Sequence, residues 1–172
     1  MVMMQMTQLT TNRLQFRQWT NADFPVFREF YANPVASKFV GGTKQPEEAW
    51  RNMARYVGHY HLKGYTLLAL VEKQTGAVAG AMGLWNSEPW PELELGYWLL
   101  PAMQGKGYAT EGATAVHNYA FNELKVPTLV SYIDPSNTAS INVATKVGAV
   151  PDGTTQLAHF GTVTVYRYPG PG

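Results

Sequence analysis

Short runs of apolar and β-branched residues alternate along the chain with longer stretches in which apolar residues recur every three or four positions. The short runs are bounded by turn residues, which is typical of strands, and the longer period is typical of amphipathic helices. The pattern predicts six strands and four helices in the order β-α-α-β-β-β-α-β-α-β. The predicted strands cover residues 14–19, 65–72, 77–85, 92–100, 128–133 and 160–168.

Residues that favour helix ends mark the four predicted helices. Pro25 must lie in the first turn of the first helix, because a proline deeper in a helix costs about 3 kcal/mol. Pro46, followed by two glutamates, starts the second helix, and Gly64 ends it. The third helix runs to about Leu124, and the fourth ends at Gly148.

The order of these elements predicts an α/β fold built on one mixed sheet. Antiparallel hairpins come first and a strand–helix–strand crossover follows, which indicates helices on both faces of the sheet. Residues 92–100 are apolar almost throughout, so we expect both faces of this strand to be covered. The length of 172 residues predicts a single domain over residues 1–172.

Composition and charge exclude several classes of protein and site. The net charge of +1 comes without a basic patch, which argues against a nucleic-acid partner. The absence of cysteine excludes disulfides, thiolate nucleophiles and Cys-based zinc sites, and the four histidines lack metal-ligand spacing. No stretch has the length of a transmembrane helix, and the first ten residues carry no basic residue. We therefore expect a soluble cytoplasmic protein without a membrane partner.

A glycine pair follows the predicted strand at 92–100 and precedes the third helix. Lys106 lies between Gly105 and Gly107, which excludes a Walker loop, and Thr110 stands where a dinucleotide fingerprint needs its third glycine. Glycines still let the backbone approach a ligand, and the first N–H groups of a helix favour an anion. The spacing fits a phosphate site, to which Lys106 would add charge, and a plain turn equally well.

Three motifs in order give the chain a family resemblance. The glycine segment begins at Gln104 and reads QGKGYA, the strand before it reads ELELGYWLLP, and a later helix start reads NTASINVATKVGA. Together they resemble the GNAT N-acetyltransferases, and most closely the RimJ/RimL-like branch, which includes acetyltransferases of ribosomal-protein N-termini. The similarity spans about residues 12–167, which is nearly the whole chain.

The resemblance implies that acetyl-CoA is the co-substrate and lies in a gap where the fourth and fifth strands splay apart. It implies that backbone groups along the pantetheine arm come from Leu99, Leu100 and Pro101. It implies that backbone N–H groups hold the pyrophosphate, and these belong to Gln104, Gly105, Lys106, Gly107, Tyr108 and Ala109. Asn137 would contact the cofactor arm. Dimers are common in this family, so a homodimer is one expected assembly.

Acetyl transfer to an amine sets chemical requirements that residues can meet. The amine must lose a proton before it attacks, because its pKa lies near 10.4 for an amine of the Lys type. The thioester oxygen needs a hydrogen bond as charge develops on it. Glu94 is the candidate base, since Leu93 and Leu95 give it an apolar setting that raises a carboxyl pKa. The alternative is a charge that pairs with a neighbour at the strand end.

The departing thiolate takes a proton from an acid, and the resemblance offers Ser140 for this role. Ser140 stands three residues after Asn137, as in the family branch. The same two residues also suit a helix N-terminus, where Asn137 and Ser140 would simply cap the helix.

The sequence leaves the acceptor amine open. Residues 33–43 and the helix after them should line the acceptor site, but they carry no readable substrate code. Glu88 and Glu92 would suit a cationic amine at the pocket mouth, or they are only solvated. The acceptor is a peptide N-terminus or a small amine such as an antibiotic or polyamine. The alternative from another class is a protein that binds acyl-CoA without catalysis. Aromatic side chains that wall this pocket or fill the core are Trp85, Trp90, Tyr97 and Trp98.

Overall fold

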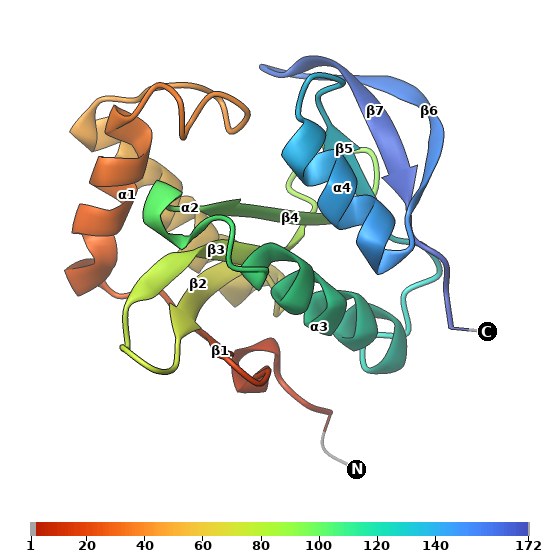
Figure 1. Ribbon diagram of the computed structural model, residues 1–172, viewed down its shortest axis with the longest axis horizontal. Coiled ribbons are helices and arrows are strands. Elements are labelled where there is room, and N and C mark those ends of the chain that lie inside the picture. The colour runs from red at the N-terminus through yellow and green to blue at the C-terminus, as the bar shows by residue number, and fades with distance from the viewer. Residues whose placement is uncertain (1–2, 172) are drawn as a thin grey trace.

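A seven-stranded mixed sheet runs through the computed structural model, which describes residues 3–171 (Figure 1). Residues 1, 2 and 172 of the predicted domain lie outside the described residues. The strand order is β1-β2-β3-β4-β5-β7-β6, and among the strands of the described residues only the β4–β5 pair is parallel. The strands are β1 (Leu14–Arg17), β2 (Leu67–Glu72), β3 (Val78–Trp85), β4 (Glu94–Leu99), β5 (Val130–Ile133), β6 (Val150–Leu157) and β7 (Gly161–Arg167).

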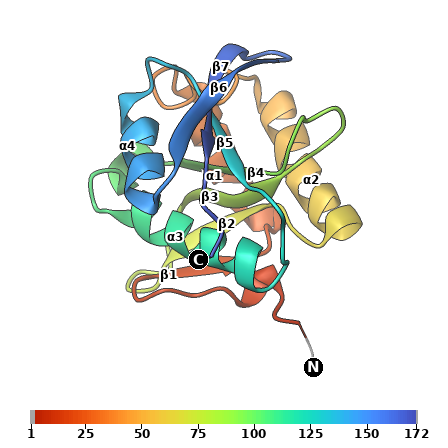
Figure 2. The ribbon, with the colours of Figure 1, turned by 90° about the vertical axis from the view of Figure 1, so that its right-hand side faces the viewer.

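Two helices cover each face of the sheet, as the alternating pattern predicts. The helices are α1 (Phe24–Ala32), α2 (Pro46–Lys63), α3 (Tyr108–Asn122) and α4 (Thr138–Val147). Figure 2 shows α3 and α4 on one side of the sheet and α2 on the other, and α1 packs with α2 (Figures 1 and 2). Each face has its own apolar core, because successive strand side chains point to opposite faces. The mixed α/β fold is therefore confirmed.

The helix ends follow the signals in the sequence. Pro25 lies in the first turn of α1, and Pro46 opens α2. The side chain of Glu48 accepts a hydrogen bond from the backbone N–H of Gln45 at 3.0 Å, which supports the start of α2. Gly64 ends α2 with φ of 81°, a left-handed conformation that glycine adopts without steric cost.

The strand β6 was missed by the sequence analysis, so the predicted set of six strands is wrong by one. Within residues 3–171, β6 pairs only with β7, at the edge of the sheet, and most of its side chains are exposed. Its register shifts between Pro151 and Thr154, and Gly153 has φ of 82°. An exposed edge strand with a proline and a bulge carries no apolar alternation from which it could be predicted.

The strands β4 and β5 splay apart after a single pair of residues, Glu94 and Val130. The carbonyl of Leu93 accepts the N–H of Val130, and the carbonyl of Leu95 accepts the hydroxyl of Ser131 at 2.6 Å. Beyond this point no strand pairs with this edge of β4 among the described residues. Because the strand period is two, the backbone of Tyr97 faces the same open edge. The splay implied by the family resemblance is present.

Candidate active site

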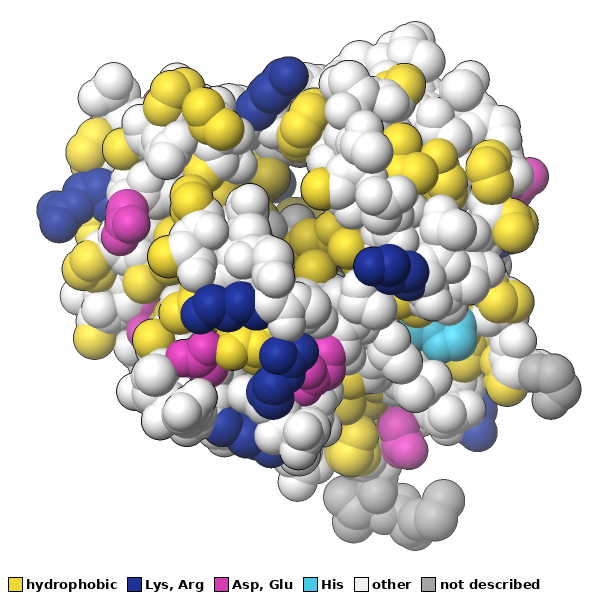
Figure 3. Space-filling model, in the orientation of Figure 1, with side chains coloured by type: hydrophobic (Ala, Val, Ile, Leu, Met, Phe, Trp, Pro, Cys, Tyr) yellow, Lys and Arg dark blue, Asp and Glu magenta, His cyan; other side chains and the backbone are white. Residues whose placement is uncertain are grey.

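A cavity of about 1300 Å³ opens where β4 and β5 separate. Its wall comes from the loop between α1 and α2, from α2, from the strands around the splay, and from the start of α4. Figure 3 shows the molecule hollowed between the α1 side and the α4 side, with hydrophobic side chains in the floor. Small-molecule pockets span roughly 300–1000 Å³, so this cavity has room for two reactants.

Glu94 stands at the point where the two strands diverge, and its side chain lines the cavity. Burial raises the pKa of Glu94 to about 7, although hydrogen bonds from Trp90 and from the backbone of Tyr132 act in the opposite direction. The indole N–H of Trp90 donates to Oε2 at 2.8 Å. Among the described residues no cation forms an ion pair with Glu94. A carboxylate with a pKa near neutrality and without a counter-ion is suited to accept a proton.

Ser140 and Tyr97 meet on the other side of the sheet. Ser140 Oγ and Tyr97 Oη share a hydrogen bond of 3.1 Å, and both side chains line the cavity. Burial raises the pKa of Tyr97, and the hydrogen bond with Ser140 opposes this shift. Asn137 Oδ1 accepts the backbone N–H of Ser140 at 3.3 Å, so Asn137 caps α4 and also lines the cavity. Asn137 therefore both caps α4 and faces the cavity.

The alternation along β4 separates these groups into two sides of one cavity. Glu94 shares a strand face with Gly96 and Trp98, and Trp98 belongs to the core under α1 and α2. Tyr97 belongs to the other face, packed against the core under α3 and α4. Since no strand of the described residues pairs with the β5 side of β4 beyond Glu94, a bond that reacts at this point can be reached by a base from one side and by an acid from the other.

The wall on the α1 and α2 side carries the segment expected to face the acceptor. The loop supplies residues 38–42 and Lys44, and α2 supplies Asn52, Arg55 and Tyr56. Glu88 also lines the cavity, whereas Glu92 is held by Arg167 through two contacts of 3.0 Å. Of the four aromatic residues considered from the sequence, all line the cavity, and Trp85 and Trp98 also belong to the core.

The glycine segment lies outside the cavity wall. None of the predicted cofactor residues between 99 and 109 is among the described residues that line the cavity. Leu99 closes β4, and its carbonyl accepts the side-chain N–H of Gln104 at 3.3 Å. The N–H of Leu100 donates to Ala79 O at 2.8 Å, and Pro101 begins a 3-10 turn. Two backbone groups expected along the pantetheine arm therefore have protein partners.

The two glycines form the turn into α3. Gly105 has φ of 74° and Gly107 has φ of 81°, and both conformations favour glycine. No side chain of the described residues caps the start of α3, so the N–H groups of Tyr108 and Ala109 lack a side-chain acceptor. The turn has the geometry of an anion site. The assignment of residues 104–109 to the pyrophosphate stays a prediction.

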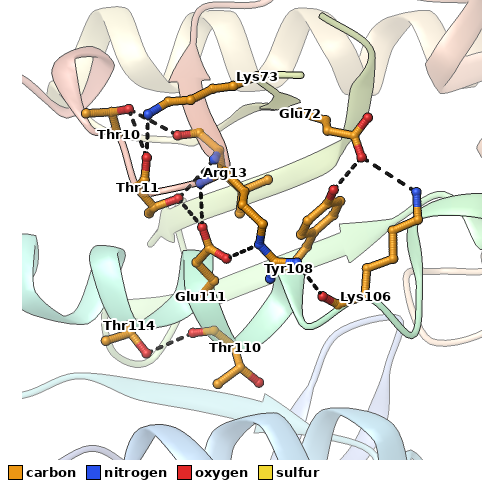
Figure 4. Close-up of polar contacts among 11 residues, drawn as sticks. Thr10, Thr11, Arg13, Glu72, Lys73, Lys106, Tyr108, Thr110, Glu111 and Thr114 are labelled. Atoms are coloured by element: carbon orange, nitrogen blue, oxygen red, sulfur yellow. Dashed lines mark hydrogen bonds and ion pairs between the residues drawn. The ribbon is translucent and has the colours of Figure 1, made fainter. Parts of the chain in front are cut away.

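A polar network holds the glycine turn from behind, against β1 and β2 (Figure 4). Arg13 donates to the carbonyl of Lys106 at 2.9 Å and pairs with Glu111 at 2.7 Å. The Tyr108 hydroxyl donates a hydrogen bond to Glu72, and the expected contact of the Tyr108 backbone N–H with the pyrophosphate stays a prediction. Lys106 Nζ lies 3.6 Å from Glu72 Oε1, so its charge is directed at β2. The Lys106 charge, which we expected to favour a bound phosphate, is therefore paired with the Glu72 carboxylate.

The sequence analysis did not find the contacts of three further groups at the cavity or behind the glycine turn. Tyr97 was considered only as a wall residue. Because side chains alternate along a strand, Tyr97 and Glu94 point to opposite faces of β4, and Tyr97 points to the face covered by α3 and α4. The hydroxyl of Tyr132 is buried without a hydrogen-bond partner among the described residues, and it lines the cavity. Arg13 stands 98 positions before Glu111, and no local pattern links the two.

Comparison with known proteins identifies the family of the chain. The profile of the acetyltransferase (GNAT) domain matches residues 13–150. The uncharacterized protein YkkB of Bacillus subtilis is 32% identical over 149 residues, covering 83% of this chain and 84% of YkkB. The uncharacterized N-acetyltransferase p20 of Bacillus licheniformis is 25% identical over 151 residues, covering 86% of this chain and 85% of p20.

A solved structure extends the match to nearly the whole fold. The crystal structure of an acetyltransferase from Agrobacterium tumefaciens superposes with a TM-score of 0.85 at 36% sequence identity, over 94% of this chain and 93% of the other. The match of the domain profile to more than half of the chain, together with this similarity, assigns the family. The chain belongs to the GNAT acetyltransferases, and it is an N-acetyltransferase that uses acetyl-CoA.

Proposed function

We propose that the chain transfers the acetyl group of acetyl-CoA directly to a primary amine, with Glu94 as the general base. The observation that carries the proposal is the position of the Glu94 carboxylate at the β4–β5 splay, with a pKa raised to about 7 by burial. At neutral pH about half of a group with this pKa is ionised, and its basicity is high enough for efficient proton transfer.

In the proposed reaction the protonated amine first gives a proton to the Glu94 carboxylate. The amine nitrogen then bonds to the carbonyl carbon of the thioester, and the carbon–sulfur bond breaks. The thiolate takes a proton from the hydroxyl pair of Ser140 and Tyr97, which share a hydrogen bond of 3.1 Å. The nitrogen loses its second proton as the amide forms, and this proton restores the hydroxyl pair, so the net proton released by the reaction is the one held by Glu94. The backbone N–H of Tyr97, on the open edge of β4, is our candidate donor to the thioester oxygen.

The proposed acceptors are a peptide N-terminus, as in the RimJ/RimL-like branch, and a small amine. Both kinds occur among proteins that share the fold at 17% identity. One is RimL, a ribosomal L7/L12 alpha-N-protein acetyltransferase with a TM-score of 0.74, and another is the spermidine N-acetyltransferase of Vibrio cholerae with a TM-score of 0.71. The cytoplasmic location and the homodimer stay predictions of the sequence. No helix of the described residues is long and apolar enough to cross a membrane.

Calorimetry with acetyl-CoA and a thiol-release assay test the proposal together. We expect binding of acetyl-CoA and release of free thiol with at least one class among amino acids, polyamines, aminoglycosides and short peptides. Binding without release across this panel would favour the non-catalytic acyl-CoA-binding alternative. Absence of binding at millimolar acetyl-CoA would remove the proposed function altogether.

A further inference from the structure

The cavity wall formed by the α1–α2 loop and α2 carries cations that form no ion pair with a carboxylate of the described residues. Lys44 and Arg55 line this wall, and neither takes part in an ion pair within residues 3–171. Arg51, one helical turn before Arg55, pairs instead with Glu47 at 2.5 Å on the outer surface of α2. The same helix therefore has a neutralised arginine outside the cavity and an unneutralised one in its wall.

Aromatic rings hold both cations at the cavity. The Lys44 ammonium lies 5.7 Å from the centre of the Tyr31 ring, and the Arg55 guanidinium lies 5.5 Å from the centre of the Trp85 ring. Both rings line the cavity and are buried. A cation over an aromatic face keeps its charge and most of its N–H donors available to a ligand.

The register of the sheet ties Arg55 to the proposed base. Trp85 pairs with Glu94 across β3 and β4, so their side chains are neighbours on the same face of the sheet. Arg55 therefore lies over the ring of the residue that pairs with Glu94 across the two strands. Glu94, Lys44 and Arg55 line the same cavity, so one acceptor of suitable length can contact the carboxylate and the cations together.

The donors of Arg55 are largely unused by the protein. One N–H reaches Asn52 Oδ1 at 3.3 Å, and no other hydrogen bond of Arg55 occurs within the described residues. A guanidinium presents several N–H donors in a planar fork that matches a carboxylate or a phosphate. A polyamine would bring a second positive charge against Lys44 and Arg55.

The carboxylates of the cavity do not reverse this preference. Hydrogen bonds from Ser136 at 2.6 and 2.8 Å and the charge of Lys38 lower the pKa of Asp134, so its negative charge is set against a third cation, which lies in the α1–α2 loop. Glu92 is held by Arg167. Glu88 lines the cavity from the loop between β3 and β4, where it is exposed to solvent. The wall of α2 thus remains positive.

We propose that the acetyl acceptor is an amine that also carries an anionic group, a carboxylate or a phosphate, which Lys44 and Arg55 bind while the amine lies at Glu94. The proposal rests on the proposed function and narrows its acceptor. It favours amino-acid-like amines and acidic peptide N-termini over polyamines.

A series of acceptors matched in length tests the proposal. Straight-chain ω-amino carboxylates of increasing length are compared with diamines and with neutral monoamines of the same length, and aminoalkyl phosphates distinguish phosphate from carboxylate. We expect kcat/KM for the best amino carboxylate or amino phosphate to exceed that of the matched diamine at least roughly tenfold, since charge-assisted hydrogen bonds are strong.

Variants locate the effect. Arg55→Gln should lower kcat/KM for the anionic acceptor roughly 10- to 100-fold through KM, and leave KM for acetyl-CoA and the rate with the neutral monoamine within about twofold. Arg55→Lys should recover part of the loss, and Arg51→Gln is the matched control on the outer surface of α2.

The outcomes separate this proposal from the proposed function. Equal or better use of diamines at every length, or an equal loss for all acceptors in Arg55→Gln, would overturn the anionic acceptor while acetyl transfer stands. Failure of the unaltered protein to bind acetyl-CoA would overturn the proposed function itself.

Discussion

Two carboxylates of the same sheet, Glu72 at the end of β2 and Glu94 at the start of β4, sit in opposite electrostatic settings. Glu72 accepts hydrogen bonds from Thr75 at 2.6 Å and from Tyr108, and these lower its pKa together with Lys106. Glu94 accepts one side-chain hydrogen bond, from Trp90, and burial raises its pKa to about 7. Glu72 therefore stays ionised and holds its hydrogen-bond partners in place, whereas Glu94 can gain or lose a proton near neutral pH.

The regions around the two carboxylates differ in the same way. Behind the glycine turn, the cations Arg13 and Lys106 both have a carboxylate partner, so the polar side chains hold the turn and satisfy one another. At the cavity, Glu94, Arg55 and the hydroxyl of Tyr132 are left with unused proton or hydrogen-bond capacity. The ion pairs behind the glycine turn stabilise its position. The polar groups at the cavity that lack a protein partner lower the stability of the fold, and they are available to bind substrates.

The largest effect should come from removal of the proposed base. Glu94→Gln keeps an acceptor for the Trp90 indole but cannot take a proton, so kcat at neutral pH should fall roughly 10²- to 10⁴-fold. The rate profile of the unaltered protein should rise with pH through about 7, as Glu94 loses its proton. The variant should lack this step and lose less at high pH, where the amine is already neutral. Steady-state rates from pH 6 to 10 measure both.

The control is Glu29→Gln, which removes an exposed carboxylate of α1 outside the cavity wall and should leave the profile unchanged. A profile for Glu94→Gln that matches the unaltered protein would remove Glu94 as base.

The raised pKa of Glu94 should also make the free energy of unfolding depend on pH. The folded-state pKa of Glu94 is about 7, above its ordinary value of 4.5, so the folded state holds the proton more tightly. The free energy of unfolding should therefore fall as pH rises from 4.5 to about 7, by about 3 kcal/mol at most. Glu94→Gln should remove this fall. Urea unfolding at pH 4.5, 6 and 8 measures the difference, and equal slopes for both proteins would argue that Glu94 is solvated.

The contacts of Arg13 behind the glycine turn should affect the affinity for coenzyme A more than the rate of acetyl transfer. Arg13→Met removes the hydrogen bond to the Lys106 carbonyl and the pair with Glu111, so the turn loses its tie to β1. We expect the dissociation constant of coenzyme A to rise roughly tenfold, because small misplacements of a binding loop are costly. The value of kcat at saturating acetyl-CoA should change little. Calorimetry and initial rates separate the two effects, with Arg51→Gln as the control.

A fall in kcat for Arg13→Met with unchanged affinity for coenzyme A would contradict this role. It would mean that the network supports the reaction centre rather than the proposed pyrophosphate turn.

The sequence predicted those parts of the fold whose signals are local. The alternating strands, the Pro46 helix start and the glycine turn each depend on neighbouring residues, and each was found within about two positions. The strand β6 has exposed side chains and a bulge, so it left no apolar pattern. The motif around Glu94 pointed to the cavity, but the contact between Tyr97 and Ser140 joins residues 43 positions apart and depends on the splay of two strands.

The smallest effect should come from Lys106, which the sequence analysis offered as an added charge for the phosphate. Its ammonium lies 3.6 Å from Glu72 Oε1 and 3.7 Å from Met103 Sδ, and its side chain is half-exposed. Exposed ion pairs contribute little, so Lys106→Met should change the affinity for coenzyme A only about twofold. Gly107→Ala is the contrasting variant, because φ of 81° strains any residue with a Cβ and Arg13 Nη2 would lie 3.3 Å from it. If Lys106→Met weakens binding more than Gly107→Ala, the ammonium rather than the backbone holds the phosphate, and the pairing with Glu72 must break when the cofactor binds.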